Sequence, residues 1–82
     1  MSAIDNLAQL KALYAKIRPL PNGGPRVSVF RPNEFRDYWT VGDGDSYYGA
    51  FSSGTEARAI LKAAGFISHR MASERIVYWH TY

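Results

Sequence analysis

Cysteine is missing from this sequence of 82 residues. Its absence excludes disulfide bonds, thiolate zinc ligands and cysteine nucleophiles, and it fits a reducing compartment. Long apolar runs are missing too, since no stretch approaches the ~20 residues that a membrane-spanning helix needs. The residues after Met1, SAIDNLAQLKALY, are too polar for the core of a signal peptide. We therefore expect a cytoplasmic protein that does not enter a membrane.

Aromatic residues and arginine are abundant. Aromatic side chains make up 15% of the chain, and seven of its ten basic residues are arginine. The length fits one small domain over 1–82, and the net charge is +3. Arginine is preferred where planar contacts are made with carboxylates, phosphates or rings; a genome rich in G and C would also favour it.

Two helices are predicted from apolar spacing and from end signals. Over 3–17, apolar residues recur every three or four positions, as on one face of an amphipathic helix. A second helix is predicted over 55–64, because Ser53 and Glu56 form a capping box at its start. Gly65 stands where a left-handed residue closes a helix.

Short segments rich in β-branched and aromatic residues predict five strands. They lie at 26–31, 35–41, 46–51, 66–70 and 75–82. The GDGD sequence between the second and third strands is a hairpin signal, and short connections favour antiparallel pairing. The sequence therefore predicts an α+β fold of two layers in the order αβββαββ, with a mainly antiparallel sheet of four to five strands packed against two helices.

Motifs for catalysis and for metal binding are scarce. Asp43 and Asp45 lack the further ligands of a calcium loop, so the hairpin turn explains them. His69 and His80 lie on separate predicted strands, and no spacing implies the third ligand that a zinc site needs. No serine has a nucleophile-elbow context and no acid has an evident partner. We expect no enzyme, no cofactor and no metal.

The last segment, RIVYWHTY, carries aromatic residues on both faces of a strand. One face of the predicted sheet is assigned to the core, with Phe35, Trp39, Phe51, Phe66, Val77 and Trp79 as its large residues. The other face is open, with Arg36, Tyr38, Tyr48, Tyr78, His80 and Tyr82. On the third strand the two faces could be exchanged, because Tyr47 and Tyr48 are adjacent and Gly49 could mark a bulge.

Tyrosine, tryptophan and arginine are enriched at the energetic centres of protein interfaces, and they also stack on bases and hold phosphates. We therefore expect a partner-binding surface made of Arg36, Tyr38, Tyr48, Arg70, Arg75, Tyr78, His80 and Tyr82. The partner is a protein or, as the alternative, a nucleic acid bound with modest specificity. Monomer and homodimer both remain open, since an exposed face or a strand edge could pair with a second copy.

In size and overall form, as a short α+β domain without cysteine or catalytic motifs, the chain resembles small phage-encoded inhibitors such as anti-CRISPR proteins. The resemblance implies a stoichiometric binder that occludes a host nucleic-acid-processing complex, for example a CRISPR-Cas effector. Its basic charge argues against imitation of DNA, so such a protein would dock on an acidic protein patch or on nucleic acid itself.

Overall fold

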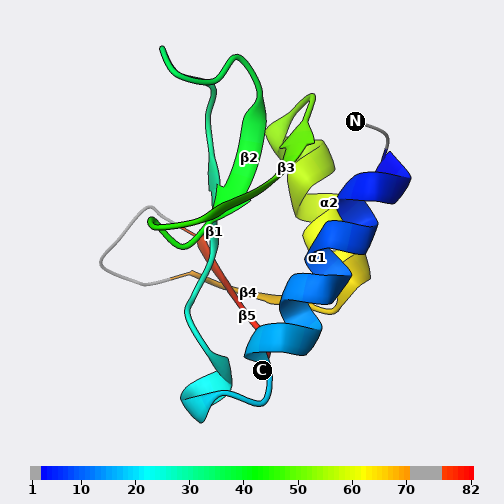
Figure 1. Cartoon of the computed structure of the whole chain (residues 1–82), viewed down its shortest axis with the longest axis vertical. Coiled ribbons are helices and arrows are strands. Elements are labelled where there is room, and N and C mark those ends of the chain that lie inside the picture. The colour runs from blue at the N-terminus through cyan, green and yellow to red at the C-terminus, as the bar shows by residue number, and fades with distance from the viewer. Residues whose placement is uncertain (1–2, 71–76) are drawn as a thin grey trace.

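The computed structural model describes residues 3–70 and 77–82. Two helices lie beside each other on one side of the molecule, and the strands occupy the other side (Figure 1). The elements are α1 (Ala3–Ile17), a short 3-10 helix η1 (Pro21–Gly23), β1 (Ser28–Phe30), β2 (Trp39–Gly42), β3 (Tyr47–Phe51), α2 (Gly54–Ala64), β4 (Ile67–Arg70) and β5 (Val77–His80). In the described ranges, neither helix has the length and apolar character to cross a membrane.

The strands form two antiparallel sheets, which corrects the prediction of one sheet of four to five strands. The sheets are β1-β2-β3 and β4-β5. They meet where Val27 and Trp79 exchange two backbone hydrogen bonds, with N–O distances of 3.0 and 2.7 Å. Pairing does not extend towards the N-terminus from Val27, because Pro25 has no N–H to donate and Gly24 turns the chain with a φ of 78°. The two sheets are therefore joined by a single β-bridge and not by a continuous ladder of backbone hydrogen bonds.

Helix α1 has the predicted bounds of 3–17. Leu10, Leu13 and Ile17 are buried at the expected spacing. They face the core together with Ala57 and Leu61 of α2.

The N-terminus of α2 carries the predicted cap in an altered form. The Ser53 hydroxyl accepts a hydrogen bond from the Glu56 backbone N–H at 3.1 Å. The Glu56 carboxylate does not return to the Ser53 N–H as in a standard capping box. It accepts from the backbone N–H of Ser52 at 2.8 Å and from its hydroxyl at 2.6 Å. The Ser53 hydroxyl thus satisfies a backbone donor in the first turn of α2, and the Glu56 carboxylate satisfies the two donors of Ser52 before the helix.

The C-terminus of α2 ends at Gly65, as predicted. Gly65 has a φ of 113°, and its N–H donates to the Lys62 carbonyl at 3.1 Å. The N–H of Phe66 reaches back to the Leu61 carbonyl, also at 3.1 Å. These two bonds form a Schellman motif, and Phe66 is buried directly after it.

The β2–β3 ladder contains a bulge on β3. Trp39 pairs with Phe51 and Val41 pairs with Tyr48, so three steps along β3 match two steps along β2. Gly49 lies within the longer stretch with a φ of 75°, a value that glycine adopts without steric cost.

The bulge decides which tyrosine faces the core. Thr40 supports it, since its hydroxyl lies 3.0 Å from the carbonyl oxygens of both Tyr48 and Gly49. Tyr48 packs against the core, whereas Tyr47 lies on the outer face of the sheet. The prediction that Tyr48 belongs to the open face is therefore wrong, and the exchange of faces that Gly49 suggested is what occurs.

The predicted core is largely correct. Phe51, Phe66 and Trp79 are buried, and the half-buried side chains of Trp39 and Val77 pack against them.

Phe35 is the exception, because its side chain is 83% exposed. The predicted strand at 35–41 starts only at Trp39, since Asn33 organises a turn before it. The Asn33 side-chain oxygen accepts from the N–H of Phe35 at 2.7 Å and from that of Arg36 at 3.1 Å. This turn holds Phe35 out of the strand.

Candidate interaction surface

The outer face of the three-stranded sheet carries a stack of side chains that we call the Tyr47 cluster, made of Phe30, Arg36 and Tyr47. Strand register places Phe30 and Tyr47 on the same face, through their partners Thr40 and Gly42. The two rings meet nearly perpendicular, with centroids 5.4 Å apart. The Arg36 guanidinium carbon lies 4.0 Å from the Tyr47 ring centroid, close enough for a cation–π contact.

The β1–β2 connection, residues 31–38, contains Arg36 of this cluster together with further exposed side chains. The connection extends away from the helices in Figure 1. It includes Phe35 with its 83% exposed ring and Tyr38, which is 39% exposed. Arg36 is half-buried, and its guanidinium lies over the Tyr47 ring. The connection therefore presents aromatic area and one oriented cation to solvent.

A second group, the β4–β5 cluster, consists of Arg26, His69, Tyr78 and His80. The register pairs His69 with Tyr78, so both lie on the same face of the two-stranded sheet as His80. The His69 and His80 rings stand edge to face, with centroids 4.6 Å apart. The Arg26 guanidinium carbon lies 4.6 Å from the Tyr78 ring centroid.

The surroundings of His80 lower its pKa below the ordinary value of 6.5. Partial burial removes water that would solvate the charged ring, and the neighbouring His69 and Arg26 repel a positive charge. The imidazole of His80 is therefore mostly neutral at neutral pH.

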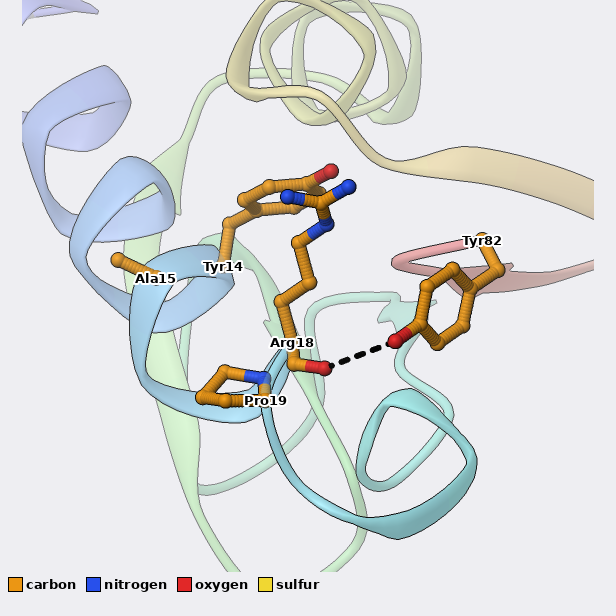
Figure 2. Close-up of a pocket in the computed structure, with 5 residues that line it drawn as sticks. All are labelled: Tyr14, Ala15, Arg18, Pro19 and Tyr82. Atoms are coloured by element: carbon orange, nitrogen blue, oxygen red, sulfur yellow. Dashed lines mark hydrogen bonds between the residues drawn. The ribbon is translucent and has the colours of Figure 1, made fainter.

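A shallow hollow of about 400 Å³ lies where the C-terminal residues meet the end of α1 (Figure 2). Its lining consists of Tyr14, Ala15, Arg18, Pro19 and Tyr82. The Tyr82 hydroxyl donates to the Arg18 carbonyl at 3.3 Å, and the Arg18 guanidinium lies above the Tyr14 ring at 5.8 Å. The lining side chains include two tyrosines and one arginine, and none of them is acidic or a histidine.

The predicted surface residues belong to separate groups of contacts in the fold. Arg36 and Tyr38 belong to the Tyr47 cluster and its surroundings, Tyr78 and His80 belong to the β4–β5 cluster, and Tyr82 lies at the hollow beside α1.

Two further predicted residues cannot be placed on either cluster. Arg70 is the last residue of β4, and its side chain lies outside the described part of the structure. Arg75 also lies outside the described residues.

Several contact residues were not predicted. Tyr47 and Phe30 were missed because only the bulge at Gly49 places Tyr47 outward. Alternation within RVSVFR does set Phe30 apart from Val29, so that signal was available. Arg26 was missed because its contact with Tyr78 depends on the Val27–Trp79 bridge, which joins distant segments.

Comparisons with protein-family models, with curated proteins and with solved structures return no match for this chain.

Proposed function

We propose that this protein works by stoichiometric binding to a protein partner, without catalysis, and that the Tyr47 cluster together with Phe35 and Tyr38 forms the contact surface. One observation carries the proposal: the Arg36 guanidinium is stacked at 4.0 Å on the Tyr47 ring, and Phe35, the preceding residue in the chain, is 83% exposed. We take the partner to be part of a host nucleic-acid-processing complex, such as a CRISPR-Cas effector, because small inhibitors that the chain resembles in form occlude such complexes.

The chemistry of the surface matches that of an interface centre. Arginine and tyrosine dominate binding energy in protein interfaces when they are packed and oriented in advance. The Tyr47 ring restricts the Arg36 side chain, so less conformational entropy is lost when Arg36 pairs with a carboxylate. Burial of an exposed phenylalanine such as Phe35 contributes about 1.5–3 kcal/mol. A partner with an apolar pocket beside an acidic residue would use both features.

Two features of this surface favour a protein over a nucleic acid. Arg36 already covers one face of the Tyr47 ring, and that face is the platform on which a base would stack. Charge is the second feature, because Arg31 and Arg36 share the connection with Glu34 and Asp37. A locally balanced charge does not attract a phosphate backbone.

Nucleic-acid binding of modest specificity is the second candidate. It is favoured by the net charge of +3 and by the β4–β5 cluster, where Arg26 lies over Tyr78 and its charge acts on His80. That cluster, and not the Tyr47 cluster, would then contact phosphates.

The test is affinity capture of the partner from host lysate, with and without nuclease, by the unaltered protein and by Phe35→Ala and Arg36→Ala variants. Lys11→Ala is the matched control, because it removes one exposed positive charge from α1. We expect a discrete protein that survives nuclease and binds each surface variant at least about tenfold more weakly, a loss of about 1.4 kcal/mol. The Lys11→Ala variant should bind normally.

Two results would contradict the proposal. One is a captured protein that binds Phe35→Ala and Arg36→Ala as tightly as the unaltered chain. The other is capture that disappears with nuclease and falls steeply with salt, with Arg26→Ala as the sensitive variant, which would establish the nucleic-acid candidate.

A further inference from the structure

The chain's two histidines come together in the fold. They are separated by ten residues in sequence, yet their ring centroids lie 4.6 Å apart on the outer face of β4-β5. Ile67 pairs with His80 and His69 pairs with Tyr78, so the two histidines occupy diagonal positions on neighbouring strands. His69 is exposed and His80 is half-buried, which leaves the pair accessible from solvent.

We propose that His69 and His80 together bind one divalent transition-metal ion of the class that prefers imidazole nitrogen, namely Cu²⁺, Ni²⁺ or Zn²⁺, with water completing the coordination shell. This proposal is independent of the proposed protein partner, since it concerns β4-β5 and not the Tyr47 cluster.

The distance between the rings permits a shared ion. A metal–imidazole bond is ~2.0–2.1 Å long, so two nitrogens on one ion lie at most about 4 Å apart. Rings whose centroids are 4.6 Å apart reach this separation when they rotate about their side-chain bonds from the present edge-to-face arrangement. In the present arrangement His69 Nε2 lies 3.2 Å from the Tyr82 backbone oxygen, so an ion bound at Nε2 would replace this contact.

The chemistry of the two rings also suits a metal. Metal binding requires neutral imidazole, and the lowered pKa of His80 keeps that ring neutral at neutral pH. Competition from thiolates does not arise, because the chain has no cysteine.

The proposed site is an open one, because His69 and His80 supply only two protein ligands. Among residues 3–70 and 77–82, no group of three or more acidic, histidine or cysteine side chains is placed to hold an ion. A two-ligand site keeps open positions for water or for a donor from a partner, and it binds more weakly than a closed structural zinc site. Affinity should follow the general order for nitrogen ligands, with Cu²⁺ tighter than Ni²⁺.

The test is a calorimetric titration of the full chain, free of any histidine tag, with Ni²⁺ at pH 7.5. The variants are His69→Gln, His80→Gln and the double substitution. Arg26→Gln is the control, because it alters the same cluster and keeps both imidazoles. A parallel NMR titration with Zn²⁺ follows the imidazole signals, which belong to two residues only. Thermal melts establish that each variant is folded.

We expect one ion per chain, with each single variant binding at least about tenfold more weakly because one imidazole cannot chelate, and with the double variant binding no more tightly than either single variant. The Arg26→Gln variant should bind at least as tightly as the unaltered chain, since it removes a nearby positive charge. The proposal is overturned if either single variant retains full affinity, or if Ni²⁺ gives no binding heat and Zn²⁺ leaves the imidazole signals unchanged.

Discussion

The side-chain amide of Asn6 makes a hydrogen bond with each backbone polar group of Ala50. Its Nδ2 donates to the Ala50 carbonyl at 2.8 Å, and its Oδ1 accepts from the Ala50 N–H at 3.1 Å. Gln9 adds a third contact, since its side-chain oxygen accepts from the Gly49 N–H at 3.1 Å. Helix α1 thus occupies the edge of β3 that a further strand would use. A second copy of the chain cannot pair with β3 at these residues, which matters because open edges invite association.

Replacement of Asn6 by leucine should destabilise the fold by about 2 kcal/mol. Asn6 is buried, and the substitution leaves the N–H and carbonyl of Ala50 without their partners, at a typical cost of ~1–3 kcal/mol for such groups. Urea denaturation measures the loss as a lower midpoint at unchanged slope.

The Asn6→Asp variant provides the matched control, because its defect should depend on pH. At neutral pH its carboxylate would face the Ala50 carbonyl without a proton to donate, so burial and this contact raise the pKa of the new carboxyl. Below that pKa the protonated group can again donate to the carbonyl, and the difference in stability from the unaltered protein should shrink. A difference that is constant from pH 7 to pH 4 would show that the amide pairing is not what stabilises this edge.

Gly49→Ala should destabilise the fold more than Gly44→Ala. Both glycines have positive φ, 75° and 102°, so alanine is strained at each position by about 1–3 kcal/mol. An added Cβ at Gly44 meets nothing within 4 Å, whereas at Gly49 it would lie 2.7 Å from the Phe51 ring and 3.2 Å from Asn6 Oδ1. Denaturation of the two variants side by side separates backbone strain from the steric clash. Equal losses would mean that the bulge adjusts without disturbing the buried ring.

Local signals explain which parts of the fold could be predicted from the sequence. Both helices were predicted within one residue, because apolar spacing and the Ser53 and Gly65 end signals lie inside the segment that they organise. The predicted strand at 35–41 begins too early, because the prediction follows the alternation of residue types from Phe35, whereas the turn organised by Asn33 extends to Arg36. That turn acts through two side-chain hydrogen bonds, which hold Phe35 outside the sheet.

Contacts between distant segments explain the rest. The separation into two sheets depends on the Val27–Trp79 bridge, which no local pattern predicts. For the candidate surface, the prediction identified Arg36 and Tyr78 as residue types suited to contacts. It could not identify the rings and cations that they meet, because Tyr47 faces outward only after the bulge and Arg26 reaches Tyr78 only across the bridge.

Stability should fall in two separate ranges as the solution is acidified. His80 has a folded-state pKa below 6.5. As the pH falls below 6.5, the imidazole is therefore protonated in the unfolded chain before it is protonated in the folded protein, and unfolding becomes more favourable.

The second range belongs to two carboxylates. Asp43 has a pKa below its ordinary 3.8, because the N–H groups of Ser46 and Asp45 donate to its carboxylate, each at 2.9 Å. The Glu56 carboxylate is held below its ordinary pKa of 4.5 by the Ser52 hydroxyl and N–H. The contribution of both acids is present above these ordinary values and is lost as pH falls through the lower folded-state values.

Denaturant titrations from pH 8 to pH 2.5, with the unaltered protein and two variants, resolve the two ranges. His80→Gln should remove the dependence just below pH 6.5 and leave the acidic range unchanged. Asp43→Asn should leave the dependence just below pH 6.5 unchanged and reduce the loss in the acidic range to the part that Glu56 contributes, because the amide oxygen of the new side chain can still accept the two backbone hydrogen bonds but does not titrate. NMR titration of the metal-free protein provides an independent check on the same group, since the His80 ring signals should move with a pKa below 6.5 and below that of an unfolded peptide. A His80 pKa at or above 6.5 would mean that partial burial and the charges of His69 and Arg26 do not act on this ring as its position on β5 requires.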